Sequence, residues 1–146
     1  MGTASPFLSK EELAQIVTAI EASELVTSGE IRVHIESHCK GEALERAAAL
    51  FRELQMDQTQ ERNAVLVYVA FRSQRYAIYG DQGIHEKLAV DFWDLTTTAM
   101  RESFLKKDYC GGICRAVYDI GAQLIRLFPY KQGDVNELDD AVSIGE

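Results

Sequence analysis

Oxygen-bearing side chains stand beside the predicted strands of this sequence, and their chemistry suits a cation. Glu30 precedes the first strand, Asn63 precedes the second, and Asp81 ends the third. Asp108, just before the last predicted helix, belongs to the same set. Carboxylate and amide oxygens are the ligands that calcium and magnesium prefer. We therefore expect a divalent-cation site built from these four residues, with an acidic surface of unconnected carboxylates as the alternative.

Asp81 has the most informative position of the four. It lies in the stretch RYAIYGDQGI, where an apolar strand gives way to a helical pattern. Ligands of open α/β folds gather at the carboxyl ends of strands, but aspartate near glycine is also an ordinary turn residue. Only a short polar loop separates this strand from the apolar run at 64–70, which predicts an antiparallel hairpin. In that hairpin Asn63 and Asp81 become neighbours, and this favours the ligand role.

The segment HCKGEALER, residues 38–46, resembles the phosphate-binding loop of cysteine-dependent phosphatases, because it follows a strand and opens a helix. Those enzymes place five residues between the cysteine and the arginine, whereas six separate Cys39 from Arg46. Glu42 and Glu45 would also repel a phosphate from the backbone amides of the loop. We therefore interpret Cys39 as an ordinary loop cysteine.

Cys110 and Cys114 lie four residues apart at the start of the last predicted helix, so both can face one side of it. A zinc site needs four ligands, and no matching pair spacing is found among His34, His38 and His85. Two buried structural cysteines are the simpler interpretation. His34 alternates onto the polar face of its strand, and we expect it to be solvated.

Apolar periodicity predicts the elements that carry these residues. The stretch SKEE is a capping box that starts the first helix. Strand 31–35 alternates apolar and polar residues, which predicts a half-covered edge strand, whereas 64–70 is apolar throughout and predicts the central strand, paired with 75–81. Further helices are expected over residues 43–54, 84–105 and 112–128. The order α-β-α-β-β-α-α predicts an α/β fold with a short mixed sheet covered by helices.

The whole chain suits one domain. Its 146 residues can bury a single full-sized core, and 47% hydrophobic with 26% charged residues is typical of a globular protein. We divide the chain into an N-terminal extension at 1–8, a domain at 9–130 and an acidic, mobile tail at 131–146.

Charge and cysteine usage limit the partners and the compartment. The net charge of −8 repels phosphate backbones, so we expect no nucleic acid partner. No apolar run approaches the roughly 20 residues needed to cross a bilayer, so no membrane span is expected. The N-terminus MGTASPFLSK lacks the basic start and apolar core of a secretion signal. Three cysteines form no even disulfide framework, which favours a cytoplasmic location.

A family resemblance accompanies these patterns. The succession FLSKEELAQIVTAI, ELVTSGEIRVHIES, FRELQMDQTQERNAVLVYVA and RYAIYGDQGI, followed by FW, GGI and NELDD, resembles the TPM domain family, above all its soluble, cytoplasmic-type bacterial members. The resemblance covers residues 7–140. It implies a three-layer α/β/α sandwich around a short mixed sheet. For different members it implies acid phosphatase activity, binding of calcium or other divalent ions, or accessory roles. The polar positions that match are Thr27, Glu30, Arg62, Asn63, Asp81 and Asp108.

Two functions follow from the residues and the resemblance together. The first is a divalent-metal-binding domain with metal-dependent acid phosphatase activity. In that function bound calcium or magnesium polarises a phosphoryl oxygen, and Arg62 or Arg72 stabilises the charge. No nucleophile–base pair accompanies this set, so whether the chain is an enzyme stays open. The second is a non-catalytic interaction or accessory module, in which the groove around Asp81 receives a protein partner's cationic or metal-bridged group.

Overall fold

The chain folds in the expected α/β order with three short additions. The computed structural model describes residues 7–130 and 142–145. Its elements are, in chain order, α1 (Lys10–Glu24), β1 (Glu30–Glu36), α2 (Ala43–Glu53), the 3-10 turn η1 (Met56–Gln58), β2 (Ala64–Ala70), β3 (Arg75–Gly80), α3 (Gln82–His85), α4 (Val90–Leu105), α5 (Tyr109–Leu127) and β4 (Val142–Ile144). The predicted order is confirmed, with η1, α3 and β4 added to it.

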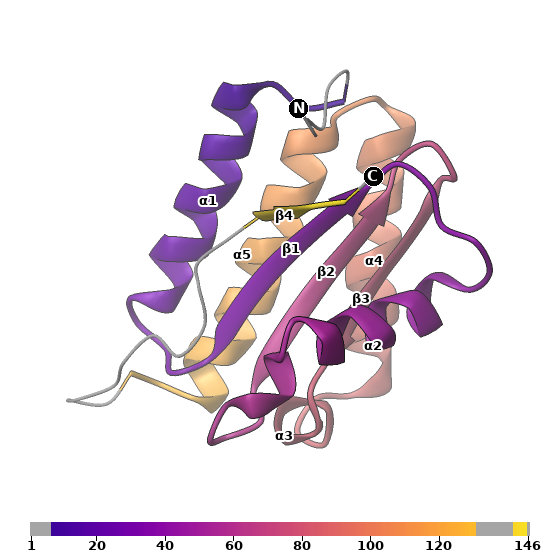
Figure 1. The fold of residues 1–146 in the computed structure, drawn as a ribbon. Coiled ribbons are helices and arrows are strands. Elements are labelled where there is room, and N and C mark those ends of the chain that lie inside the picture. The colour runs from indigo at the N-terminus through magenta and orange to yellow at the C-terminus, as the bar shows by residue number, and fades with distance from the viewer. Residues whose placement is uncertain (1–6, 131–141, 146) are drawn as a thin grey trace.

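The single helix expected over 84–105 is wrong, since the chain forms α3 and α4 there instead. The Gly83 N–H donates to the Arg62 carbonyl over 2.8 Å, which holds α3 against the loop before β2. The chain then leaves helical geometry and restarts at α4, which runs along the sheet (Figure 1).

A four-stranded mixed sheet in the order β3-β2-β1-β4 forms the middle layer. β1 runs parallel to β2, and β2 pairs antiparallel with β3, as the hairpin prediction required. β2 is buried along its whole length and lies inside the sheet, as expected of the apolar run.

The edge position expected of β1 is wrong. β4 adds to it in parallel, with Val142 opposite Val33 and Ile144 opposite Ile35. β4 comes from the segment that we expected to be a mobile tail, so that expectation is wrong for residues 142–144. Three residues carry too short a pattern to predict a strand, and the rest of the expected tail, 131–141, lies outside the described residues.

Helices cover both faces of the sheet, which confirms the three-layer α/β/α sandwich (Figure 1). α1, α4 and α5 pack on one face and α2 on the other. Alternate residues of the same strand therefore serve two cores. Val65, Val67 and Val69 pack with α1, α4 and α5, whereas Leu66 and Tyr68 pack with α2.

The predicted capping box is confirmed, and a glycine marks the crossing of two helices. The Glu12 N–H donates to Ser9 Oγ over 3.1 Å and the Ser9 N–H to the Glu12 carboxylate over 2.9 Å, which is the reciprocal capping box. Gly121 in α5 marks a close crossing with α1, because a Cβ there would lie 2.3 Å from Ser23 Oγ. A larger residue at 121 would push these two helices apart.

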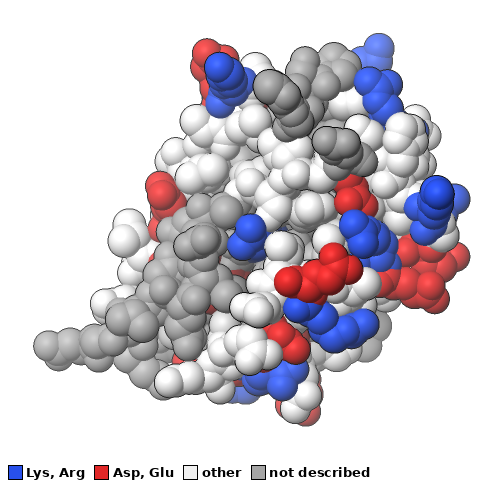
Figure 2. Space-filling view, viewed as in Figure 1, with Lys and Arg blue, Asp and Glu red and all other residues white. Residues whose placement is uncertain are grey.

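The core includes residues before the expected domain start at position 9. Leu8 is 3% exposed, and the Phe7 ring stacks on Phe71 with centroids 4.6 Å apart. The packing therefore begins at residue 7 among those described. No helix within 7–130 is both long enough and apolar enough to cross a membrane. On the face seen in Figure 2, basic and acidic side chains are interspersed over α2, so the net negative charge forms no single patch there.

Candidate functional site

The backbones of three of the four predicted ligands come together at the end of the sheet where β1 and β2 begin and β3 ends. Glu30 lies opposite Ala64, and its N–H points at the Asn63 carbonyl. The Asp81 N–H donates to the Ala64 carbonyl over 2.9 Å, which confirms that Asn63 and Asp81 are neighbours. All three predicted ligands are buried, with exposed fractions of 4% for Glu30, 1% for Asn63 and 3% for Asp81.

Asp108, the fourth predicted ligand, lies at the opposite end of the molecule. It precedes α5, and its carboxylate caps that helix by accepting from the Gly111 N–H over 3.0 Å. The other end of α5 reaches the start of β1, where Leu124 contacts Gly29. A helix of 19 residues spans about 28 Å, so one ion cannot contact both Asp108 and Asp81.

Asp81 is held by Arg62 in an ion pair with two hydrogen bonds. Arg62 Nε donates to one carboxylate oxygen over 2.7 Å and its Nη2 to the other over 2.9 Å, which raises the pKa of Arg62. The Gln82 N–H adds a third bond of 2.7 Å. Asp81 therefore caps α3 and neutralises Arg62. Arg72, the other predicted phosphate-stabilising residue, follows the far end of β2, where its guanidinium lies 5.6 Å from the centre of the Phe7 ring.

The side-chain oxygen of Asn63 has no hydrogen-bond partner among the described residues and could therefore serve as a metal ligand. Its Nδ2 donates to Ser28 Oγ over 3.4 Å, and Ser28 in turn donates to the Glu61 carboxylate over 2.7 Å. Asn63 Oδ1 is buried and accepts no hydrogen bond from any described residue. Across 7–130 and 142–145, no three His, Cys, Asp or Glu side chains gather in an arrangement able to hold a metal. The residues therefore fit a metal only in part.

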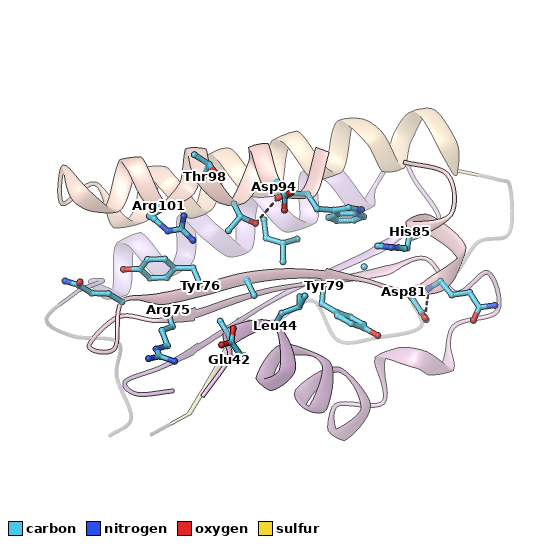
Figure 3. A pocket seen from close by; sticks show the side chains of 18 of the residues that line it. Glu42, Leu44, Arg75, Tyr76, Tyr79, Asp81, His85, Asp94, Thr98 and Arg101 are labelled. Carbon is cyan, nitrogen blue, oxygen red and sulfur yellow. Dashed lines mark hydrogen bonds between the residues drawn. The ribbon is translucent and has the colours of Figure 1, made fainter. Parts of the chain in front are cut away.

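A groove of about 980 Å³ runs along β3, at the free edge of the sheet. β3 forms its floor and is the edge strand on this side. One wall comes from α4 and the other from the residues that open α2 (Figure 3). The Trp93 ring of α4 packs directly on Gly80 of β3, where an added Cβ would lie only 2.6 Å from the ring. Leu44 of α2 is 56% exposed on the facing wall.

Charged side chains of both signs line the groove (Figure 3). Arg75 and Arg101 lie at the end where β3 begins, beside Tyr76 and Glu42. Asp94 lies toward the end where β3 stops and, among the described residues, forms no ion pair. Glu42 offsets part of the positive charge at the first end, and Arg62 neutralises Asp81 at the other. The groove therefore keeps a net positive charge at Arg75 and Arg101 and a net negative charge at Asp94.

A buried polar cluster between β1, β2 and α2 was not predicted. Glu36 accepts two bonds of 3.0 Å from Arg46, one of 2.5 Å from the Tyr68 hydroxyl and one of 3.2 Å from His34 Nε2. Burial alone would raise the pKa of Glu36, but the bonds from Arg46, Tyr68 and His34 lower it to about 2. The expectation of a solvated His34 is wrong: it is 7% exposed, and burial lowers its pKa.

The cysteines occupy structural positions. Arg46 binds Glu36, and Cys39 is buried, so no phosphate loop forms around this pair. The sulfurs of Cys110 and Cys114 lie 4.0 Å apart, and both thiols are free. Burial raises the pKa of Cys110 to about 12.

Comparison with known proteins identifies the family. A family model described as the TPM domain matches residues 4–123 of the chain. The chain belongs to the TPM domain family. No curated protein matches this TPM domain.

Two solved structures share the fold of this TPM domain. The BA42 protein from the psychrophilic bacterium Bizionia argentinensis is 39% identical, with a TM-score of 0.88, 99% of this chain covered and 100% of BA42 covered. The N-terminal domain of cg2496 from Corynebacterium glutamicum is 17% identical, with a TM-score of 0.62 over 83% of this chain and 76% of that one. The second similarity concerns the fold alone.

The sequence predicts a groove around Asp81 but not its extent along β3 in this TPM domain, because the walls of the groove are far apart in the sequence. Arg75 follows the hairpin turn, and Arg101 lies in the last turns of α4. Burial along β3 changes from exposed at Arg75 to half-buried at Tyr79 and Gly80, and this sign of an open edge is visible only in the folded structure. Only the sheet order makes β3 that edge.

Proposed function

We propose that this TPM domain is a non-catalytic interaction module whose binding surface is the groove along β3. One observation supports this most: the open edge of β3 forms the floor of a groove, and a helix lies on each side of it. Exposed strand edges are surfaces on which other chains pair, and many domains cover them for that reason. Here the helices flank the edge of β3 without covering it.

The occupant that suits this shape is an extended segment of a partner protein. The β3 edge of a second copy would bring its own α2 and α4, and these would collide with the same helices of the first copy. A single extended segment carries no flanking helices and avoids this collision. Leu44 and Tyr79 give it apolar contacts on the α2 side, and Tyr76 gives it one on the α4 side.

Selection from a display library of random eight-residue peptides tests this function. We expect enriched peptides to shift the backbone resonances of residues 76–80 in the ¹⁵N-labelled protein. Thr98→Trp, which fills the groove from α4, should weaken them about tenfold or more. The matched control is Leu95→Trp, since Leu95 lies on the same helix, is 69% exposed and does not line the groove. Absence of any binder, or equal binding by both variants, would contradict the proposal.

A weak calcium or magnesium site beside Asp81 is the second candidate. Asn63 Oδ1 favours it, because a buried oxygen without a partner in the described residues is a donor that a hard cation can use. Arg62 would compete with the ion for Asp81, and its side chain, 44% exposed, has room to move away. We expect an affinity on the order of 10⁻⁴ to 10⁻³ M.

Two substitutions test the ion site by magnesium and calcium titration followed by chemical shifts. Asp81→Asn should abolish the metal-induced shifts near the start of β2. Arg62→Gln should strengthen them severalfold by removing the competing cation. Shifts that neither substitution changes would place any bound ion elsewhere.

Phosphatase activity, implied by the family resemblance, depends on the same ion in this proposal. Only Arg62 of the two predicted arginines lies near enough to act there. Hydrolysis of a generic phosphate monoester that disappears with a chelator and with Asp81→Asn would support it. A cytoplasmic location stays a prediction from the unpaired cysteines.

A further inference from the structure

The backbone of β3 presents three residues to the groove. The Asp81 N–H donates to the Ala64 carbonyl. Hydrogen-bonded pairs recur at every second residue of an antiparallel pair of strands, so β3 bonds to β2 through every second residue counted back from Asp81. The alternate residues Tyr76, Ile78 and Gly80 therefore direct their N–H and C=O groups outward. No described residue hydrogen-bonds to these outward groups.

The size of the groove matches one strand. A strand within a layered sheet occupies roughly 160 Å³ per residue, from a rise of ~3.3 Å, a strand spacing of ~4.8 Å and a sheet spacing of ~10 Å. The groove volume of about 980 Å³ thus holds about six residues. β3 itself has 6 residues, so an added strand could pair along its whole length.

The charges give the added strand a direction. Antiparallel pairs are the commoner arrangement in sheets. An antiparallel neighbour of β3 would begin beside Gly80 and Asp94 and end beside Arg75 and Arg101. A cationic residue at its amino end and a carboxylate at its carboxyl end would meet charges of opposite sign.

We propose that the partner segment adds to β3 as an antiparallel strand of about six residues, with a cationic residue facing Asp94 and a carboxylate held between Arg75 and Arg101. This inference rests on the proposed function of the groove and names the chemistry of its occupant. Main-chain hydrogen bonds to Tyr76, Ile78 and Gly80 supply the affinity. The two charged ends set the direction and the choice of partner.

A pair of probe peptides tests the charges. The first is an acetylated and amidated hexapeptide with lysine first, glutamate last and alternating threonine and valine between. The second has lysine and glutamate exchanged. We expect the first to bind at least about fivefold more tightly, measured by chemical shifts of residues 76–80. Arg101→Glu should remove this preference, and Lys10→Glu should not, because Lys10 is also exposed but lies on α1.

N-methylation of the first peptide tests the strand addition without changing the protein. Alternate backbone N–H groups of an added strand face β3, and the others face away. Methylating one alternating set should weaken binding about tenfold or more, and methylating the other should leave it within about twofold. Equal effects of the two sets, or equal binding of the two charge arrangements, would overturn the inference.

These outcomes are separable from failure of the proposed function. Selected peptides that need an open groove but tolerate both methylated sets would leave the interaction module standing and remove strand addition. Pairing of two copies through β3, seen as a doubled rotational correlation time with shifts at residues 76–80, would replace the peptide by a second copy and overturn the inference.

Discussion

Replacing Glu36 by glutamine should destabilise the protein in a pH-dependent way. The pKa of Glu36 is lowered from 4.5 to about 2, and at ~1.4 kcal/mol for each pKa unit the buried carboxylate contributes about 3 kcal/mol at neutral pH. Because the folded pKa lies below the unfolded one, this contribution is complete above about pH 4.5 and decreases as the pH falls toward 2. Glutamine keeps the shape of the side chain but not its charge.

Urea unfolding of both proteins at several pH values measures this effect. We expect Glu36→Gln to lower the free energy of unfolding by about 3 kcal/mol at pH 7, and the difference to shrink by roughly 1–2 kcal/mol at pH 3.5. Glu53→Gln is the control, because Glu53 approaches the same Arg46 at 3.8 Å but is 62% exposed. It should change the free energy by less than about 1 kcal/mol at every pH. A Glu36→Gln difference that does not depend on pH would refute the reasoning.

Three further predictions follow from single contacts. Gly83→Ala should lower the free energy of unfolding by about 2 kcal/mol or more, because its Cβ would lie 2.2 Å from the Glu61 carbonyl oxygen; an unchanged urea midpoint would contradict the packing. At pH 8 the Cys110 thiol, whose pKa is raised by burial to about 12, should react with iodoacetamide at least about tenfold more slowly in the folded than in the unfolded protein. Equal rates by mass spectrometry would show that it is accessible. Deleting residues 142–146 should raise the pKa of His34 toward its ordinary value in an NMR titration, because Gly145 packs against His34 Nε2; an unchanged midpoint would mean that β4 does not bury this ring.

Local patterns in the sequence determined most of the architecture. The capping box at Ser9, the apolar run at 64–70 and the short polar loop after it depend only on neighbouring residues. They specify a helix start, a buried strand and a hairpin wherever these elements lie in the fold. For the same reason the adjacency of Asn63 and Asp81 could be predicted, since a hairpin fixes which of its residues lie opposite one another.

Tertiary structure alone decided which charged residues meet. Asp81 and Asp108 both look like loop-end ligands in the sequence, but the length of α5 separates them. Glu36 and His34 alternate like solvated residues of an edge strand, and they are buried because Gly145, which follows β4, and Arg46 of α2 pack against them. The groove exists because the sheet order leaves β3 at an edge between helices far apart in the chain. Periodicity reports that a residue faces one side of its own element, whereas burial and pairing depend on which other element packs against that side.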